Sequence, residues 1–225
     1  MFVVNFIYKS PLSGPGPKCD PDTHMDAKTI YAYNQLAQKY DDETSDFWER
    51  FPRTFLDEFA RLTQGKVLDV GSGPGRDGLL LQQRGLEVLC FVASETMVNI
   101  CKSKGLQGVV GDFNTLPFED DSFNGVWAYT SLLHVPKVEI IRPLQEIKRV
   151  LKSGGYLGLG LIEGEGEEYK ESAKVTLPRL FSYYQKDEIE KILNDLDFDM
   201  VFFEQFKPGK HNYLNFVAQN QKVRR

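Results

Sequence analysis

Short apolar segments alternate with amphipathic segments from residue 66 onward, and no other feature of the sequence constrains the fold as strongly. Five apolar segments have the length and composition of buried strands: 66–70, 87–92, 107–110, 124–129 and 156–162. Three segments between them have helical spacing: 77–84, 94–104 and 143–151, the last with Pro143 at its first position. Because strands joined through helices pair in parallel, the pattern predicts an α/β fold with helices on both faces of a parallel sheet.

The segments before and after this alternation predict further elements. Two helical patterns precede the first strand; the second begins after Ser45, a suitable N-cap, and holds Pro52 in its first turn or at a kink. Residues 186–196 predict an amphipathic helix. Residues 199–206 and 213–219 alternate polar and apolar side chains, so they predict a closing antiparallel hairpin.

The charge balance and the cysteines exclude several classes of protein. The 225 residues include 32 Asp and Glu against 27 Lys and Arg, a net charge of −5, which argues against broad nucleic-acid binding but leaves room for a local basic patch. No apolar run approaches the roughly 18 residues of a membrane span. Cys19, Cys90 and Cys101 form no CxxC pair and the His residues are scattered, so we expect reduced thiols, a cytoplasmic protein and no metal site.

The segment 67–77, VLDVGSGPGRD, follows the first predicted strand and opens the first predicted helix of the alternation. Glycines at such a turn let the backbone approach a ligand closely, and the following helix N-terminus favours a negative ligand group. Arg76 stands where a dinucleotide fingerprint requires its third glycine, and no P-loop lysine follows. Asp69 lies at the strand end, where its carboxylate can bind a cationic amine. On this segment alone, a turn that binds nothing remains the alternative.

Four motifs follow one another along the chain: VLDVGSGPGRD at 67–77, GDFNTLPF at 111–118, DSFNGVW at 121–127 and EIKRVLKSGG at 146–155. With this order and spacing, residues 31–216 resemble the class I S-adenosylmethionine-dependent methyltransferases, especially those that act on small molecules. The resemblance implies a Rossmann-like sheet of seven mostly parallel strands with an antiparallel last strand. It also implies S-adenosylmethionine as the cofactor and in-line methyl transfer to a small-molecule acceptor.

The resemblance assigns cofactor contacts to eight residues: Asp69, Gly71, Gly73, Val92, Ala93, Asp112, Phe113 and Tyr129. Asp69 and the backbone of the two glycines would face the methionine part of the cofactor. Asp112 and Phe113 would hold the adenine, and Tyr129 would border the methyl group. A tyrosine ring face can also attract the sulfonium by a cation–π interaction.

Val92 departs from the family pattern, because the second strand usually ends in an acid that binds both ribose hydroxyls. Valine accepts no hydrogen bond, and each bond to a charged group contributes about 1.5–3 kcal/mol. Three interpretations follow: weakened cofactor affinity, an altered cofactor pose, or a noncatalytic binding protein on the same fold. Glu95 lies three residues on, and we interpret it as compensating a helix dipole rather than replacing the acid.

His134, in the segment SLLHVP after the fourth strand, is the candidate catalytic base. The alternative is a histidine that hydrogen-bonds to the backbone and shapes the loop. Tyr33 and Tyr40 are candidate substrate contacts from the N-terminal helix, unless they pack on the sheet. The resemblance adds Arg179 and Tyr183, in the insertion before the last helix, as a further substrate wall.

The motifs predict one domain, residues 26–225, preceded by a flexible arm rich in Pro and Gly at residues 1–25. Within it we expect an N-terminal helical lid (26–64), a cofactor-binding core (65–163) and a substrate-side insertion with the C-terminal hairpin (164–225). The expected partner is a small-molecule acceptor, with no membrane association. An RNA acceptor is a third alternative, against which the acidic charge balance argues.

Overall fold

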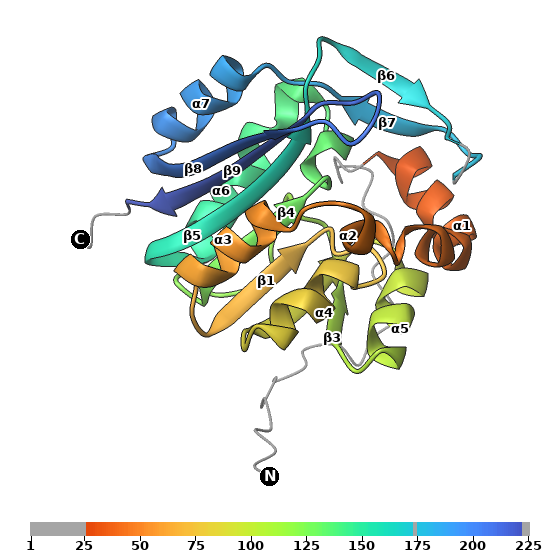
Figure 1. The fold of residues 1–225 in the computed structure, drawn as a ribbon, viewed down its shortest axis with the longest axis horizontal. Coiled ribbons are helices and arrows are strands. Elements are labelled where there is room, and N and C mark those ends of the chain that lie inside the picture. Colours follow the sequence, from red (N-terminus) through yellow and green to blue (C-terminus); the bar gives the residue numbers. More distant parts are fainter. Residues whose placement is uncertain (1–25, 173–174, 222–225) are drawn as a thin grey trace.

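A seven-stranded sheet forms the centre of the computed structural model, which describes residues 26–172 and 175–221 (Figure 1). Its strands are β1 (Lys66–Val70), β2 (Glu87–Val92), β3 (Gln107–Val110), β4 (Phe123–Tyr129), β5 (Leu151–Ile162), β8 (Phe198–Phe206) and β9 (Tyr213–Asn220). The order across the sheet is β3-β2-β1-β4-β5-β9-β8, and in this sheet β9 runs opposite to the other six strands. The predicted α/β fold with an antiparallel last strand is therefore confirmed. The predicted arm, residues 1–25, lies outside the described residues.

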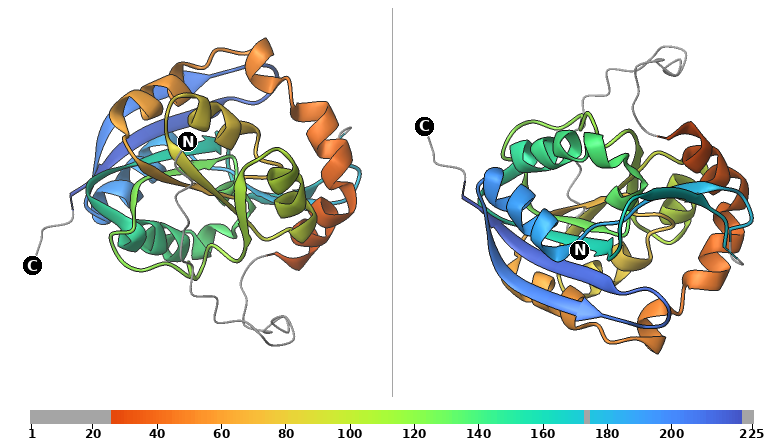
Figure 2. Two further views of the ribbon diagram at one scale, coloured as in Figure 1. Left: turned by 90° about the horizontal axis from the view of Figure 1, so that it is seen from below. Right: turned by 90° about the horizontal axis from the view of Figure 1, so that it is seen from above.

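Helices cover both faces of the sheet. They are α1 (Ala27–Thr44), α2 (Phe47–Arg50), α3 (Thr54–Leu62), α4 (Arg76–Gln83), α5 (Glu95–Ser103), α6 (Ile141–Val150) and α7 (Lys186–Asp195), with short 3-10 turns η1 (Leu132–His134) and η2 (Lys137–Glu139). Helices α3, α4 and α5 pack on one face through a buried cluster that includes Phe55, Leu81 and Cys101. Helices α6 and α7 pack on the other face through Ile147 and Leu193. Figure 2 shows the sheet between these two layers.

Side chains alternate along the strands, and this alternation decides which face each residue serves. On β4, Val126 and Ala128 join the α6–α7 cluster, while Trp127 and Tyr129 join the α3–α5 cluster. Asp69 of β1 pairs in register with Trp127, so its carboxylate shares the α3–α5 face. Full burial of a large apolar side chain contributes roughly 1.5–3 kcal/mol. The two clusters therefore fix the ends of β1 and β4 and the loops that follow them.

Two prolines account for the main differences from the predicted helices. Pro52 lies between α2 and α3, so the second predicted helix is divided in two. Ser45 is the C-cap of α1 and does not cap α2, so its predicted role was wrong. Helix α6 begins at Ile141, and the prediction of Pro143 as its first residue was also wrong. Pro143 is the third residue, where the amide of any residue lacks an acceptor within the helix.

A hairpin that the sequence analysis did not predict stands beside α1. It consists of β6 (Glu167–Lys170) and β7 (Arg179–Ser182), which pair antiparallel. Figure 1 shows the hairpin at the same end of the molecule as α1, and the amide of Leu180 donates a hydrogen bond to Thr29 Oγ1 at 2.9 Å. Within residues 26–172 and 175–221, none of the helices combines the length and the apolar character needed to cross a bilayer.

Candidate functional site

A cleft opens at the carboxyl ends of β1, β2 and β4, where α1 faces these strand ends; its empty volume, mouth included, is about 800 Å³. Ten of the predicted site residues line it: Tyr33, Tyr40, Asp69, Gly71, Gly73, Val92, Ala93, Phe113, Tyr129 and His134. Asp112, Arg179 and Tyr183 are not part of its wall. Open α/β sheets bind ligands at this edge, so the cleft is the candidate site.

The glycine turn brings the backbone after β1 close to the residues after β4. Gly71 has a φ of +70°, and a Cβ at this position would lie 2.2 Å from the Cβ of Ser131. The amide of Gly71 donates to the carbonyl of Phe91 at 2.7 Å, which ties the ends of β1 and β2 together. Any residue other than glycine would be strained and would collide here. The turn therefore presents backbone, rather than a side chain, to the cleft.

Three buried polar atoms of the cleft have no hydrogen-bond partner among the described residues: Asp69 Oδ2, Tyr129 Oη and Ser131 Oγ. A buried polar group without a partner is destabilising by roughly 1–3 kcal/mol, so these atoms mark positions for ligand groups. Burial raises the pKa of Asp69 well above its usual range, and the neighbouring Asp77 raises it further. A cationic ligand group would stabilise the Asp69 carboxylate.

Asp77 joins three elements at one wall of the cleft. Its carboxylate accepts hydrogen bonds from Trp48 Nε1 at 2.7 Å, Trp127 Nε1 at 3.0 Å and Arg76 Nε at 2.6 Å. A buried carboxylate is tolerated only with such partners, and the Asp77 side chain is 7% exposed. The contacts hold α2 against α4 and β4. They therefore fix the wall on which the Tyr129 ring lies, since this ring packs against Trp48 with centroids 5.2 Å apart.

The end of β2 carries no carboxylate in the cleft wall. Val92, Ala93 and Ser94 line the cleft at this point. Ser94 caps α5, as its side chain accepts from the Met97 amide at 3.2 Å, and its hydroxyl donates to Asn34 Oδ1 at 2.6 Å. Glu95 is the first residue of α5, is exposed and is not part of the wall, a position consistent with dipole compensation. No side chain of the described cleft wall therefore replaces the acid that the family pattern has at the position of Val92.

Phe113 and Asp112 lie differently with respect to the cleft. Phe113 is buried and contributes to the wall. Asp112 is half-buried, and its Oδ1 accepts a hydrogen bond from the Asn114 amide at 2.8 Å, which shapes the loop after β3. A contact between Asp112 and adenine remains a prediction.

His134 and Tyr33 meet across the cleft from η1 and α1. Tyr33 Oη lies 2.9 Å from His134 Nε2, and His134 Nδ1 lies 2.5 Å from the Leu180 carbonyl oxygen. Because a carbonyl only accepts, Nδ1 carries the hydrogen and Nε2 accepts from the Tyr33 hydroxyl. Arg179 Nη1 in turn donates to Tyr33 Oη at 2.9 Å. Burial lowers the pKa of His134 to about 4, so the imidazole is neutral near pH 7.

The two residues of the predicted insertion lie behind or away from the cleft. Arg179 is buried, and its hydrogen bond to Tyr33 connects it to the cleft wall. The Tyr183 hydroxyl donates to Glu168 at 2.7 Å, and its ring stacks on Phe181. Direct substrate contacts by Arg179 and Tyr183 therefore have no geometric support in this conformation. Both residues depend on the β6–β7 hairpin, which the sequence pattern did not reveal.

Arg76, Thr130 and Ser131 line the cleft but were not among the predicted site residues. Arg76 directly follows the glycine motif, and this position could have identified it as a cleft residue. Thr130 and Ser131 directly follow β4, and Thr130 adopts a φ of +53°, which is uncommon for a residue other than glycine. Residues that follow a parallel strand lie at the ligand-binding edge, and this rule could have identified both.

Comparison with known proteins gives one matching family model and several relatives. A model described as "Methyltransferase domain" matches residues 68–159. An uncharacterized methyltransferase of Staphylococcus carnosus is 27% identical over 171 residues, 73% of this chain and 79% of that protein. Sterol methyltransferase-like 3 of Botryococcus braunii is 34% identical over 103 residues, 42% of this chain and 26% of that protein. Three of the curated relatives that the chain matches are aligned over only 26–39% of their own length.

Among solved structures, the fold is similar to that of the Burkholderia thailandensis 1,6-didemethyltoxoflavin-N1-methyltransferase with bound 1,6-didemethyltoxoflavin and S-adenosylhomocysteine. The TM-score is 0.65 at 17% identity, covering 97% of this chain and 99% of that chain. The family match and the fold similarity are consistent with the strand order and with the glycine turn at the ligand-binding edge. Residues 68–159 therefore match a methyltransferase-domain model, and the chain has a fold similar to that of a solved methyltransferase.

Proposed function

We propose that this protein binds S-adenosylmethionine in the cleft and transfers its methyl group to a small-molecule acceptor. The observation that carries the proposal is the buried Asp69 Oδ2, which lies without a partner among the described residues beside a turn that presents backbone to the cleft. A buried carboxylate next to such a turn is complementary to the cationic amine of an amino-acid end.

The other residues of the cleft fit the remaining parts of this cofactor. The Phe113 side chain offers an apolar surface for a planar base at the end of β3. Tyr129 is the last residue of β4 and lines the cleft together with the glycine turn. Its ring can attract a sulfonium by a cation–π interaction. The cofactor supplies, when bound, a methyl group on a sulfonium with an excellent leaving group. Positioning by the protein then provides much of the rate enhancement.

In this proposal, Tyr33 and His134 remove a proton from the acceptor. An acceptor proton would pass to Tyr33 Oη while the Tyr33 proton passes to His134 Nε2, along the 2.9 Å contact between these atoms. The pKa of His134, lowered to about 4 by burial, makes it a weak base. Such a base suits an oxygen acceptor, whose proton becomes strongly acidic as the new C–O bond forms. Removal of this proton then follows methyl transfer rather than preceding it.

A small-molecule acceptor is supported by the concave shape of the site and by the relatives. The cleft is lined by residues from several strands and helices, at the edge where open α/β sheets bind small ligands. The names of the aligned relatives include a sterol methyltransferase-like protein, and the structural neighbour has bound 1,6-didemethyltoxoflavin. The net charge of −5 also disfavours a polyanionic acceptor.

A second candidate function is a binding protein that has lost methyl transfer. The observation that favours it is Val92, because no carboxylate replaces the ribose-binding acid in the cleft wall at the end of β2. Glu95 is exposed at the start of α5 and therefore does not replace it.

Isothermal titration with S-adenosylhomocysteine tests cofactor binding. We expect one binding site per chain, and Val92→Asp should raise the affinity about ten- to hundredfold, the equivalent of one charged hydrogen bond. Val92→Ala is the matched control, because it changes the side chain without adding an acceptor. Absence of binding at millimolar S-adenosylhomocysteine in both the wild type and Val92→Asp would overturn the proposal.

Methyl transfer itself is measured with a radiolabelled methyl donor and a panel of hydroxylated, amino and apolar acceptors. The proposed activity predicts transfer by the wild type to at least one acceptor and faster transfer by Val92→Asp at low cofactor concentration. If Val92→Asp gains cofactor affinity but transfers no methyl group to any acceptor, the binding-protein alternative is favoured.

A further inference from the structure

The guanidinium of Arg76 is a charged group of the cleft to which the contacts above assign no ligand. Arg76 is the first residue of α4, and its side chain is only 17% exposed. Its Nε donates to Asp77, and its guanidinium lies 4.7 Å from the centroid of the Phe47 ring and 5.9 Å from that of Trp48. Within the described ranges, neither terminal nitrogen of Arg76 makes a hydrogen bond. The side chain is therefore held in place with two donors available.

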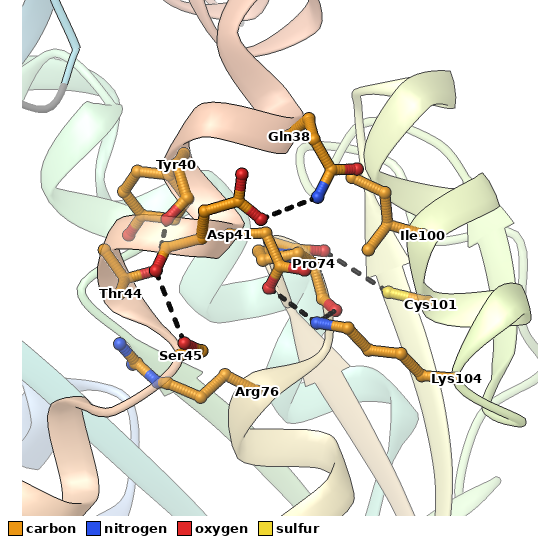
Figure 3. A network of polar contacts seen from close by, with 12 residues as sticks. Gln38, Tyr40, Asp41, Thr44, Ser45, Pro74, Arg76, Ile100, Cys101 and Lys104 are labelled. Carbon is orange, nitrogen blue, oxygen red and sulfur yellow. Dashed lines mark hydrogen bonds and ion pairs between the residues drawn. The ribbon is translucent and has the colours of Figure 1, made fainter.

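The other cation near the glycine turn already has protein partners. Lys104 Nζ donates to Asp41 Oδ1 at 2.5 Å and to the Pro74 carbonyl at 3.1 Å. Figure 3 shows these contacts and shows the Arg76 side chain pointing away from Lys104. Lys104 does not line the cleft, whereas Arg76 does. Arg76 is thus the cation through which the described cleft wall can meet a negative ligand group.

The charges of the cleft match a zwitterion. Asp69 and Asp77 are the carboxylates of the described wall, and both oxygens of Asp77 are engaged by Trp48, Trp127 and Arg76. Asp69 Oδ2 remains as an acceptor and the terminal nitrogens of Arg76 remain as donors. An arginine fork of this kind binds a carboxylate with two parallel hydrogen bonds. A ligand that carries an ammonium close to a carboxylate satisfies both residues.

We propose that Arg76 is the carboxylate-binding residue of the cleft and that it acts together with Asp69 on the amino-acid end of a ligand. The inference rests on the proposed function, since the methionine part of the cofactor is such an end. A carboxylate on the methyl acceptor is the other source of the same chemistry, and the experiment distinguishes the two.

The first measurement compares S-adenosylhomocysteine with 5′-methylthioadenosine, which lacks the amino-acid end. Arg76→Gln should lower the affinity for S-adenosylhomocysteine about ten- to hundredfold and leave that for 5′-methylthioadenosine within about twofold of wild type. Arg76→Lys keeps the charge without the fork, so it should lie between the two. Arg84→Gln is the matched control: Arg84 follows the same helix, pairs with Asp57 outside the cleft, and should leave both affinities unchanged.

The second measurement adds benzoate or benzyl alcohol to protein saturated with S-adenosylhomocysteine. If Arg76→Gln keeps the S-adenosylhomocysteine affinity but loses benzoate binding, Arg76 serves the carboxylate of the acceptor. If Arg76→Gln changes neither S-adenosylhomocysteine nor benzoate binding, or weakens S-adenosylhomocysteine and 5′-methylthioadenosine alike, the proposal is overturned. Circular dichroism checks the fold of each variant, and Arg76→Lys carries the test if Arg76→Gln does not fold.

The proposed function and this inference can fail separately. If wild-type protein binds neither S-adenosylhomocysteine nor 5′-methylthioadenosine but binds benzoate through Arg76, the methyltransferase activity is lost as a proposal and the carboxylate site stands. If wild-type protein binds both nucleosides and Arg76→Gln matches it with every probe, only the role of Arg76 is lost.

Discussion

At the scale of the residue, Asp69 should limit the stability of the ligand-free protein. Burial raises its pKa well above the usual range, so ionisation at neutral pH is opposed in the folded state. An acid with a raised folded pKa destabilises the fold as the pH rises above its unfolded value. Asp69→Asn should therefore raise the melting temperature by a few degrees, since about 1 kcal/mol corresponds to roughly 2–4 °C in a domain of this size.

The same substitution should weaken cofactor binding, because the amide cannot pair with an ammonium. We expect a loss of at least about tenfold in the affinity for S-adenosylhomocysteine. Calorimetric melting and titration on one preparation measure both effects. A variant that melts lower and binds as well as the wild type would show that Asp69 is structural.

The lowered pKa of His134 predicts how the stability of the protein depends on pH. Its folded pKa is lowered from 6.5 to about 4, so between these values the unfolded chain binds a proton that the folded protein excludes. The contribution of neutral His134 to the free energy of unfolding is therefore fully present above about pH 6.5. The free energy of unfolding falls by up to about 3 kcal/mol as the pH drops to about 4. His134→Gln should flatten this part of the curve, measured as the free energy of unfolding in urea at several pH values. His211→Gln, whose histidine is only partly buried, is the control and should keep most of the slope.

The residues that could be predicted are those whose position follows from local chain geometry. Asp69 and Gly71 lie in one strand–turn–helix segment, so the motif alone locates them at the cleft. The contact between Tyr33 and His134 joins residues 101 positions apart, and no local pattern encodes it. Asp77 was missed for a similar reason, because its partner Trp48 comes from a different helix 29 positions away.

At the scale of the element, α1 is fastened to the glycine turn through one lysine. Lys104 of the α5 C-cap bridges Asp41 of α1 and the Pro74 carbonyl (Figure 3). Lys104→Met should loosen α1 and lower the affinity for S-adenosylhomocysteine about fivefold without changing a residue of the cleft wall, because the partly buried ion pair contributes on the order of 1 kcal/mol.

Hydrogen exchange provides the structural measurement for this prediction. Amides of residues 27–44 should exchange faster in Lys104→Met than in wild-type protein. Lys102→Met, on an exposed position of the same helix, should exchange and bind like the wild type. Unchanged exchange together with reduced affinity would mean that Lys104 acts on the turn and not on α1.

The elements that were predicted correctly are those with strong hydrophobic periodicity. Helix boundaries near a proline were predicted less well. Glycines with positive φ follow α4 and α5, so the ends of both helices were predictable. Pro52 was predicted in a first turn or at a kink, and it lies between α2 and α3. Pro143 was predicted at the first helical position and is the third residue of α6, because proline is tolerated throughout a first turn and the local sequence does not select the position. Strand β6 is mostly exposed and strand β7 is mostly buried, so neither strand shows the alternation of buried and exposed residues on which strand prediction depends.

At the scale of the whole molecule, the sheet order makes one ligand stabilise several elements at once. The cleft is lined by residues from α1, β1, α4, β2, α5 and β4 and by the loops after the strands. These elements belong to both hydrophobic clusters, since Phe113 packs in one and Tyr129 in the other. A bound cofactor should therefore oppose global unfolding rather than protect a single loop.

S-adenosylhomocysteine at about 100 times its dissociation constant should stabilise the folded protein by about 2.7 kcal/mol. This corresponds to a rise of roughly 5–10 °C in the melting temperature of a domain of this size. At the same ligand concentration Val92→Asp should show a larger rise and Asp69→Asn a smaller one, so that the order of the shifts follows the order of the affinities. Binding by titration without any shift would mean that the cleft-forming elements unfold before the rest of the sheet. The two hydrophobic clusters, which share every strand of the cleft, argue for a single transition.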